Sequence, residues 1–174
     1  TPVRIWHWLN ALGIVTLCVT GAQIRFPEHV EIFGTYKAAI ALHNTAGVVV
    51  AISFFLWLIY YLAIARSMAK IYMPTREDLQ TGILRQAKYY FLTFFLGGAH
   101  MHHTNTQDKC NPMQKSAYLA IMFILVPLVI VTGILLMNVA PLRNAVLFLG
   151  GLKLLVGMHF LLACSLCAFL FTHV

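Results

Sequence analysis

Acidic residues are scarce in this sequence, and none of them lies in a long apolar run. Asp and Glu number only 5 against 12 Lys and Arg, and charged residues make up 10% of the chain. A small helical transporter that relays protons is expected to carry acidic partners inside the membrane. Their absence from the apolar runs argues against that class. The acidic residues are Glu28, Glu31, Glu77, Asp78 and Asp108.

Cysteine is also rare. The chain has 4 cysteines and no Cys-x-x-Cys-His segment, which excludes covalent attachment of a c-type haem. Cys18, Cys164 and Cys167 lie in apolar runs, where a thiol usually packs as a small hydrophobic group. Cys164 and Cys167 form a Cys-x-x-Cys pair, but no strand pattern of a redox domain surrounds it.

Hydrophobic residues, in contrast, make up 60% of the chain. Four apolar runs are long enough to cross about 30 Å of hydrocarbon as helices. We therefore predict an all-α integral membrane protein, a four-helix bundle that forms one domain over residues 1–174. Polar residues of the first run are expected to face the bundle interior, and Pro127 is expected to kink or loosen the third helix. The predicted spans are residues 8–24, 38–65, 117–137 and 145–172.

Basic residues cluster between the apolar runs, as charges that flank membrane helices do. The net charge of +7 is not arranged as a solvated patch interleaved with aromatics, so no nucleic-acid partner is expected. Four spans put both termini on one side, and this side carries eight of the Lys and Arg residues while the other carries four. The bias predicts cytoplasmic termini. Within the long connection between spans two and three, residues 76–97 are predicted to form an interfacial helix, with a partner-docking segment as the alternative.

Two histidines share one stripe of the last apolar run. His159 and His173 are fourteen residues apart, which on an α-helix gives a rise of about 21 Å and side chains within about 40° of one direction. By depth, His7 pairs with His173 on the cytoplasmic side, and His43 pairs with His159 on the outer side. Ionisable groups at such depth are costly and mark functional sites.

Two neutral imidazoles that face each other in a helix bundle can hold a planar haem between them. Gly47, one turn after His43, would leave room for the ring. Zinc is disfavoured because each level offers only two evident ligands. The alternative for any single histidine is a hydrogen-bonded packing residue, and helix packing is the favoured role of Gly133 and Gly157. A solvated loop position is favoured for His29, and His100, His102 and His103 form a loop cluster with weak metal-binding potential.

Several segments together resemble the di-haem b-type cytochrome subunits of respiratory oxidoreductases, such as the formate dehydrogenase gamma subunit, nickel-iron hydrogenase cytochrome b and thiosulfate reductase cytochrome b. The matching segments are RIWHW at His7, AAIALHNTAGVVV around His43, KCNPMQK around Asn111, and the pair His159 and His173.

This resemblance implies two haem b groups, the inner one held by His7 and His173 and the outer one by His43 and His159. It also implies a quinone, menaquinone or ubiquinone, near Asn111 and Gln114. The chain would then carry electrons across the inner membrane between the quinone and an outer iron–sulfur or multihaem c-type subunit of a complex with a separate catalytic subunit. No substrate catalysis is expected from this chain alone. A haem-free membrane anchor and a small proton-relay transporter are the alternatives.

Overall fold

The computed structural model describes residues 2–64 and 112–173, all of which are helical, in turns or in short loops. Two compact units are present. The first comprises residues 1–60 and 125–174 and contains α1 (Pro2–Arg25), α2 (Tyr36–Ile59), α6 (Val126–Met137), α7 (Arg143–Phe148) and α8 (Leu152–His173). The second comprises residues 61–124, of which the described parts are helical.

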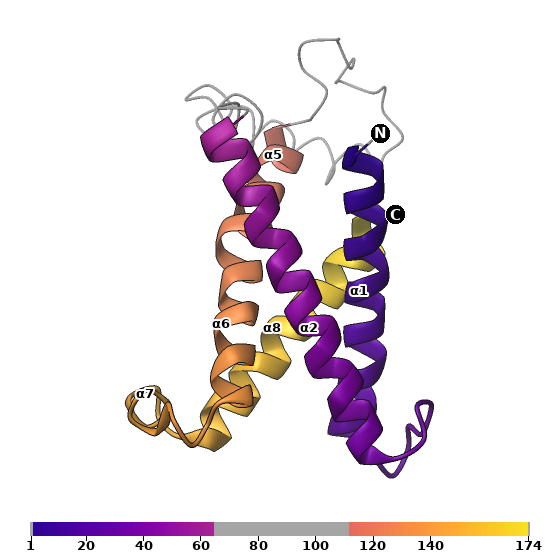
Figure 1. The fold of residues 1–174 in the computed structure, drawn as a ribbon, viewed down its shortest axis with the longest axis vertical. Coiled ribbons are helices and arrows are strands. Elements are labelled where there is room, and N and C mark those ends of the chain that lie inside the picture. Colours follow the sequence, from indigo (N-terminus) through magenta and orange to yellow (C-terminus); the bar gives the residue numbers. More distant parts are fainter. Residues whose placement is uncertain (1, 65–111, 174) are drawn as a thin grey trace, which may run out of the picture. The chain divides into compact units, whose positions relative to one another are not determined.

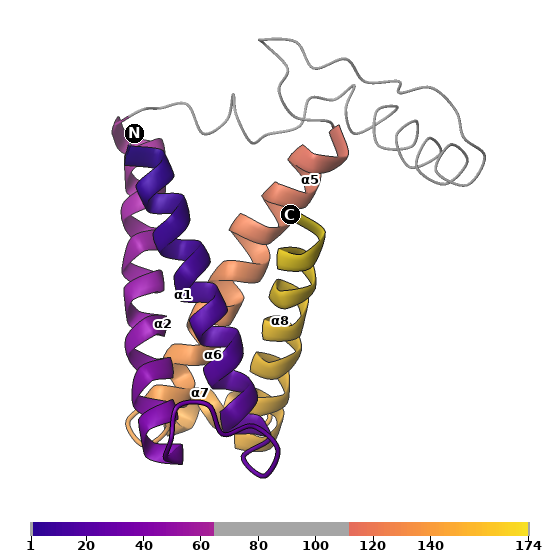
Figure 2. The ribbon, with the colours of Figure 1, turned by 90° about the vertical axis from the view of Figure 1, so that its right-hand side faces the viewer.

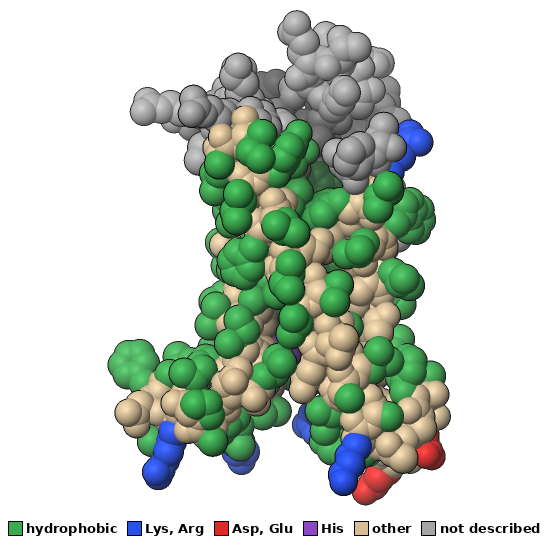
Figure 3. All heavy atoms as spheres, viewed as in Figure 1, with side chains coloured by type: hydrophobic (Ala, Val, Ile, Leu, Met, Phe, Trp, Pro, Cys, Tyr) green, Lys and Arg blue, Asp and Glu red, His purple; other side chains and the backbone are tan. Residues whose placement is uncertain are grey.

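Four helices of the described residues are long and apolar enough to span a membrane, which confirms the predicted fold class. They cover Arg4–Arg25, Tyr36–Ile64, Ser116–Met137 and Leu152–Thr172. On the face shown in Figure 3, hydrophobic side chains cover the length of the helices and charged side chains gather at their ends. A helix satisfies all of its own backbone hydrogen bonds, and so this arrangement suits a hydrocarbon environment.

In the first unit, α1 packs along α2, α6 packs along α8, and α2 contacts α6. The start of α1 and the end of α8 lie at one end of this unit, and α7 lies at the other (Figures 1 and 2). The rings of Phe26 and Phe160 meet edge to face at 6.2 Å, and the Arg25 guanidinium lies 5.6 Å from the Phe160 ring. These contacts join the end of α1 to α8 beside His159.

Thr20 and Gln23 of α1 face inward, as expected, whereas the Thr16 hydroxyl bonds its own helix at an exposed position. Thr20 is fully buried and Gln23 is 2% exposed. The Gln23 carbonyl oxygen accepts hydrogen bonds from the backbone N–H groups of Ile32 and Phe33, and its amide donates to the Gly34 carbonyl. At the other end of α1, the Asn10 amide donates to the Ser53 hydroxyl of α2 at 2.8 Å. Polar groups therefore fix both ends of the α1–α2 hairpin.

The fourth spanning helix begins later than predicted. The expected start was Ala145, but residues 143–148 form the separate short helix α7, and α8 begins at Leu152. Gly150 and Gly151 separate the two helices, and both have a φ of +90°. A helix cannot continue through such a conformation, which side-chain-bearing residues rarely adopt. Val146 of α7 folds back to pack with Leu135 and Leu155 in a small buried cluster.

The third span is loosened where Pro127 was expected to act. A π-helical segment, η3 (Ile121–Leu125), follows α5 (Pro112–Ala120) and directly precedes α6, with the proline in the first turn of α6. A proline lacks the N–H that would bond four residues back, and so the preceding turn loses its regular pattern. A second π-helical segment, η1 (Tyr60–Ile64), ends the second span. The predicted interfacial helix at 76–97 lies outside the described residues.

Candidate functional site

The structure brings two of the predicted histidines together. The ring centroids of His43, on α2, and His159, on α8, lie 6.4 Å apart, and their planes are nearly perpendicular at 78°. Both side chains are partly buried. His7 is exposed near the start of α1, and His173 ends α8 with a side chain outside the described part.

A threonine from a third helix holds the His43 ring. The hydroxyl oxygen of Thr20, on α1, lies 2.9 Å from Nδ1 of His43. The same hydroxyl lies 2.7 Å from the carbonyl oxygen of Thr16. A hydroxyl has a single proton and a carbonyl can only accept, so Thr20 donates to its own helix and accepts the Nδ1–H of His43. That tautomer leaves Nε2 with a free lone pair, the form in which a neutral imidazole binds a metal.

The His159 ring is held in the same way from the fourth helix. The hydroxyl oxygen of Thr132, on α6, lies 2.9 Å from Nδ1 of His159. It also lies 2.8 Å from the Leu128 carbonyl, one turn earlier on α6, and donates its proton there. Thr132 is 3% exposed, so this hydrogen bond is shielded from the surroundings. In each histidine, Nε2 is thus the nitrogen whose lone pair is available to a metal.

A glycine follows each of these threonines and makes room for the ring. A Cβ added at Gly21 would lie 3.4 Å from Cε1 of His43, and one added at Gly133 would lie 3.4 Å from Cε1 of His159. Gly133, for which helix packing was favoured, therefore borders an imidazole. Gly47 lies at the α1–α2 contact instead, where its Cβ would meet Leu17 at 3.8 Å, and a Cβ at Gly157 would meet nothing within 4 Å.

The two threonine–glycine pairs were not identified from the sequence as partners of the histidines. A signal was present, because Val-Thr-Gly occurs twice, at residues 19–21 and 131–133, each within an apolar run. Each copy lies one spanning helix before the histidine that it contacts. Repetition of such a tripeptide at the same level of two helix pairs is a pattern that could have indicated a matched site.

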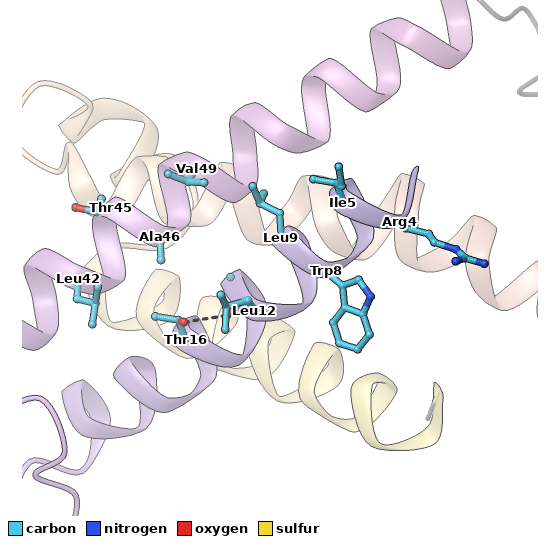
Figure 4. Close-up of a pocket in the computed structure, with 11 residues that line it drawn as sticks. Arg4, Ile5, Trp8, Leu9, Leu12, Thr16, Leu42, Thr45, Ala46 and Val49 are labelled. Carbon is cyan, nitrogen blue, oxygen red and sulfur yellow. Dashed lines mark hydrogen bonds between the residues drawn. The ribbon is translucent and has the colours of Figure 1, made fainter. Parts of the chain in front are cut away.

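The side chains of the two residues predicted to bind quinone are not among those that the structure describes. Asn111 lies outside the described residues, and Gln114 lies on α5 with a side chain that is not described. A separate groove of about 830 Å³ runs between α1 and α2, with Arg4 and Trp8 at one end and Leu42 and Thr45 at the other (Figure 4). Its described lining contains none of the four predicted ligands, so it is distinct from the His43–His159 site.

The outer pair fits a haem. If both Nε2 atoms bound one metal from opposite sides at about 2.0 Å, the imidazole centroids would lie roughly 6–6.5 Å apart. The separation in the structure is 6.4 Å. Among the described residues, no group of three or more His, Cys, Asp or Glu side chains could hold a metal ion. A ligand set of two suits the axial positions of a haem and not a structural zinc site.

Comparison with known proteins decides the family. The profile of the prokaryotic cytochrome b561 family matches residues 1–174. The chain belongs to this family. A member of a cytochrome b family is a multi-pass membrane protein for electron transfer through haem b, so the resemblance to b-type cytochrome subunits is confirmed.

Individual relatives agree with this assignment. The chain is 30% identical over 174 residues to the putative cytochrome YdhU of Escherichia coli K12, covering 98% of the chain and 63% of that protein. It is 40% identical over 60 residues to a probable Ni/Fe-hydrogenase B-type cytochrome subunit of Rhodobacter capsulatus, covering 31% of the chain and 23% of that protein. A subunit of the same name from Cupriavidus necator is 65% identical over 26 residues, or 15% of the chain and 11% of that protein.

The chain spans less than two thirds of the length of these relatives. No solved structure matches it.

Proposed function

We propose that this b-type cytochrome carries two haems, one bound by His43 and His159 and the other by His7 and His173. The observation that supports the proposal most strongly is the His43–His159 pair, with both rings held by threonine and their centroids 6.4 Å apart. When bound, each haem supplies an iron centre that accepts or donates one electron.

The spacing of the two histidines on α8 supports two haem sites at different depths in the membrane. His159 lies about two turns after the start of α8 and His173 ends it, fourteen residues and a rise of about 21 Å apart. One site therefore lies in each leaflet, and a single helix sets the distance between them. His43 and His159 are partly buried among apolar helices, and burial of this kind is one of the means by which a protein tunes a haem potential.

The proposed redox partners follow from the same arrangement of two haems across the membrane. Two relatives carry the name of a hydrogenase cytochrome subunit, and we propose that this chain likewise joins a catalytic subunit through an iron–sulfur or multihaem c-type subunit on the outer face. At the inner face it would exchange electrons with menaquinone or ubiquinone near Asn111 and Gln114. The excess of Lys and Arg on the side of the termini supports cytoplasmic termini and the inner membrane as its location.

Visible spectroscopy of the purified protein tests the haem proposal. We expect a reduced-minus-oxidised spectrum with a b-type α-band and about two haems per chain in a pyridine haemochrome assay. A colourless, folded protein would refute it and would leave a haem-free anchor as the better description.

The quinone site needs a different measurement. Asn111→Ala should slow quinone-coupled turnover of the complex while haem content stays unchanged, and Asn105→Ala, in the same connection, is the matched control. Turnover unaffected by Asn111→Ala would place the quinone elsewhere.

A further inference from the structure

The hydroxyl groups of Thr20 and Thr132 make a pair of hydrogen bonds that packing alone would not require. In both, the hydroxyl proton is used within the threonine's own helix, at 2.7 Å for Thr20 and 2.8 Å for Thr132. Each oxygen is thereby left as an acceptor, and each accepts from Nδ1 of a histidine on another helix at 2.9 Å. The arrangement is duplicated in two helix pairs that share no residue.

We propose that Thr20 and Thr132 are a matched pair of positioning residues for the outer haem. They act through the histidines: each fixes the tautomer that presents Nε2 to the metal and fixes the rotation of the ring about its own axis. Together they hold the two imidazole planes nearly perpendicular. The inference rests on the proposed haem ligation by His43 and His159.

The hydrogen-bond pattern explains why threonine is suited to this role. A threonine in a helix can bond the carbonyl three or four residues earlier, which orients its hydroxyl and leaves its lone pair pointing away from the helix. A carboxylate would do the same task with a charge, which is costly inside a membrane. Threonine therefore gives a neutral hydrogen-bond acceptor at a depth where a charged carboxylate would be energetically unfavourable.

The ring orientation is fixed by contacts on two sides. Thr20 holds the Nδ1 edge of His43, and the absent side chain of Gly21 leaves space for Cε1 of the same ring. Thr132 and Gly133 make the same two contacts with His159. A ring that is bonded at one edge and bordered by the backbone beside it has little freedom to rotate. The angle of 78° between the planes is therefore set by α1 and α6, the two helices that carry no outer ligand.

Two consequences can be measured apart from turnover. A hydrogen bond from Nδ1–H to an acceptor raises the basicity of the ligand nitrogen, so it favours the ferric state and lowers the midpoint potential. In addition, nearly perpendicular imidazole planes give a highly anisotropic low-spin ferric EPR signal, while parallel planes give a rhombic one. Loss of the threonine hydroxyl should change both readouts for one haem and leave the other haem unchanged.

The test compares Thr20→Val and Thr132→Val, which keep the shape and remove the hydroxyl, with Thr20→Ser and Thr132→Ser, which keep the hydroxyl. We expect the valine variants to retain two haems, to raise the midpoint potential of one of them and to make its EPR signal less anisotropic. That haem should also transfer to apomyoglobin about 10–100-fold more readily, the usual loss of affinity when a partner of a ligating histidine is removed. The serine variants should behave as the parent protein.

The matched control is Thr16→Val. Thr16 lies one turn before Thr20 on α1, and its hydroxyl donates to the Leu12 carbonyl of the same helix. We expect it to change none of the three readouts.

If the valine variants bind haem and show the same midpoint potential, EPR signal and transfer rate as the parent protein, the positioning role is overturned. The haem proposal itself is unaffected by that result. Absence of haem from the parent protein would instead refute the proposed function itself. If a valine variant does not fold, Thr20→Ala and Thr132→Ala replace it. An alanine variant identical to the parent in all three readouts overturns the role, and one that shifts as described, with rescue by serine, supports it.

Discussion

His43 and His159 face each other from α2 and α8 with ring centroids 6.4 Å apart. Neither helix holds its own histidine in place, because the hydrogen bonds to the rings come from α1 and α6. All four spanning helices therefore contribute to this one level of the bundle. Changes on the two helices without outer ligands should consequently affect the site as much as changes near the histidines.

Enlarging Gly133 should expel the outer haem. A Cβ at this position already lies 3.4 Å from Cε1 of His159, at the limit of ordinary contact, so Gly133→Ala should be tolerated and Gly133→Leu should push the ring aside. We expect the leucine variant to lose one haem per chain, measured by pyridine haemochrome assay. Gly157→Leu is the control, because a Cβ there meets nothing within 4 Å. Full haem content in the Gly133→Leu protein would contradict the placement of the ring.

Gln23→Leu should destabilise the α1–α2 hairpin. The side chain is 2% exposed and makes three hydrogen bonds to the backbone of residues 32–34. Its loss removes three hydrogen bonds to a partly exposed loop, at about 1 kcal/mol each, so the midpoint of thermal unfolding in detergent should fall. Asn138→Ala is the control, since the exposed Asn138 amide bonds only the Ile134 carbonyl of its own helix. Equal unfolding midpoints for the two variants would contradict the role of Gln23.

Cys18 and Cys167 should form a disulfide when an oxidant is supplied. The Cys18 thiol, on α1, lies close enough to the Cys167 thiol, on α8, to interact with it electrostatically. Copper phenanthroline should accept two electrons while the thiols lose two protons, so two fewer thiols should react with a maleimide after denaturation. Cys18→Ser should abolish this loss, and Cys164→Ser should preserve it. Persistence of the loss in the Cys18→Ser protein would point instead to the Cys164–Cys167 pair and would contradict the contact between α1 and α8.

Hydrophobic length and depth were sufficient to predict the four spans and the meeting of His43 with His159. Both follow from one-dimensional properties, since a span needs about 20 apolar residues and a residue's depth follows from its position in the span. The start of α8 was missed because Leu147, Phe148 and Leu149 continue the apolar run without a polar break. Only the positive φ of Gly150 and Gly151 interrupts the helix there.

The contacts between the threonines and the histidines could not be predicted from hydrophobic length and depth. A threonine in a membrane helix commonly bonds its own helix, as Thr16 and Thr45 do here, and the repeated Val-Thr-Gly does not by itself show which side chain Thr20 faces. The distinction depends on the rotation of α1 about its axis, which directs Thr20 toward His43. Helix rotation also places Gly47 beside Leu17 of α1, and its role in haem packing stays a prediction.

The most direct test of the account is the haem content of histidine variants at the outer level. We predict that His43→Ala and His159→Ala each lose one and the same haem, and that the double variant loses no more than either single variant. His7→Ala should remove the other haem. Folded single variants that lose different haems, or a double variant that loses both, would contradict the sharing of one haem by His43 and His159.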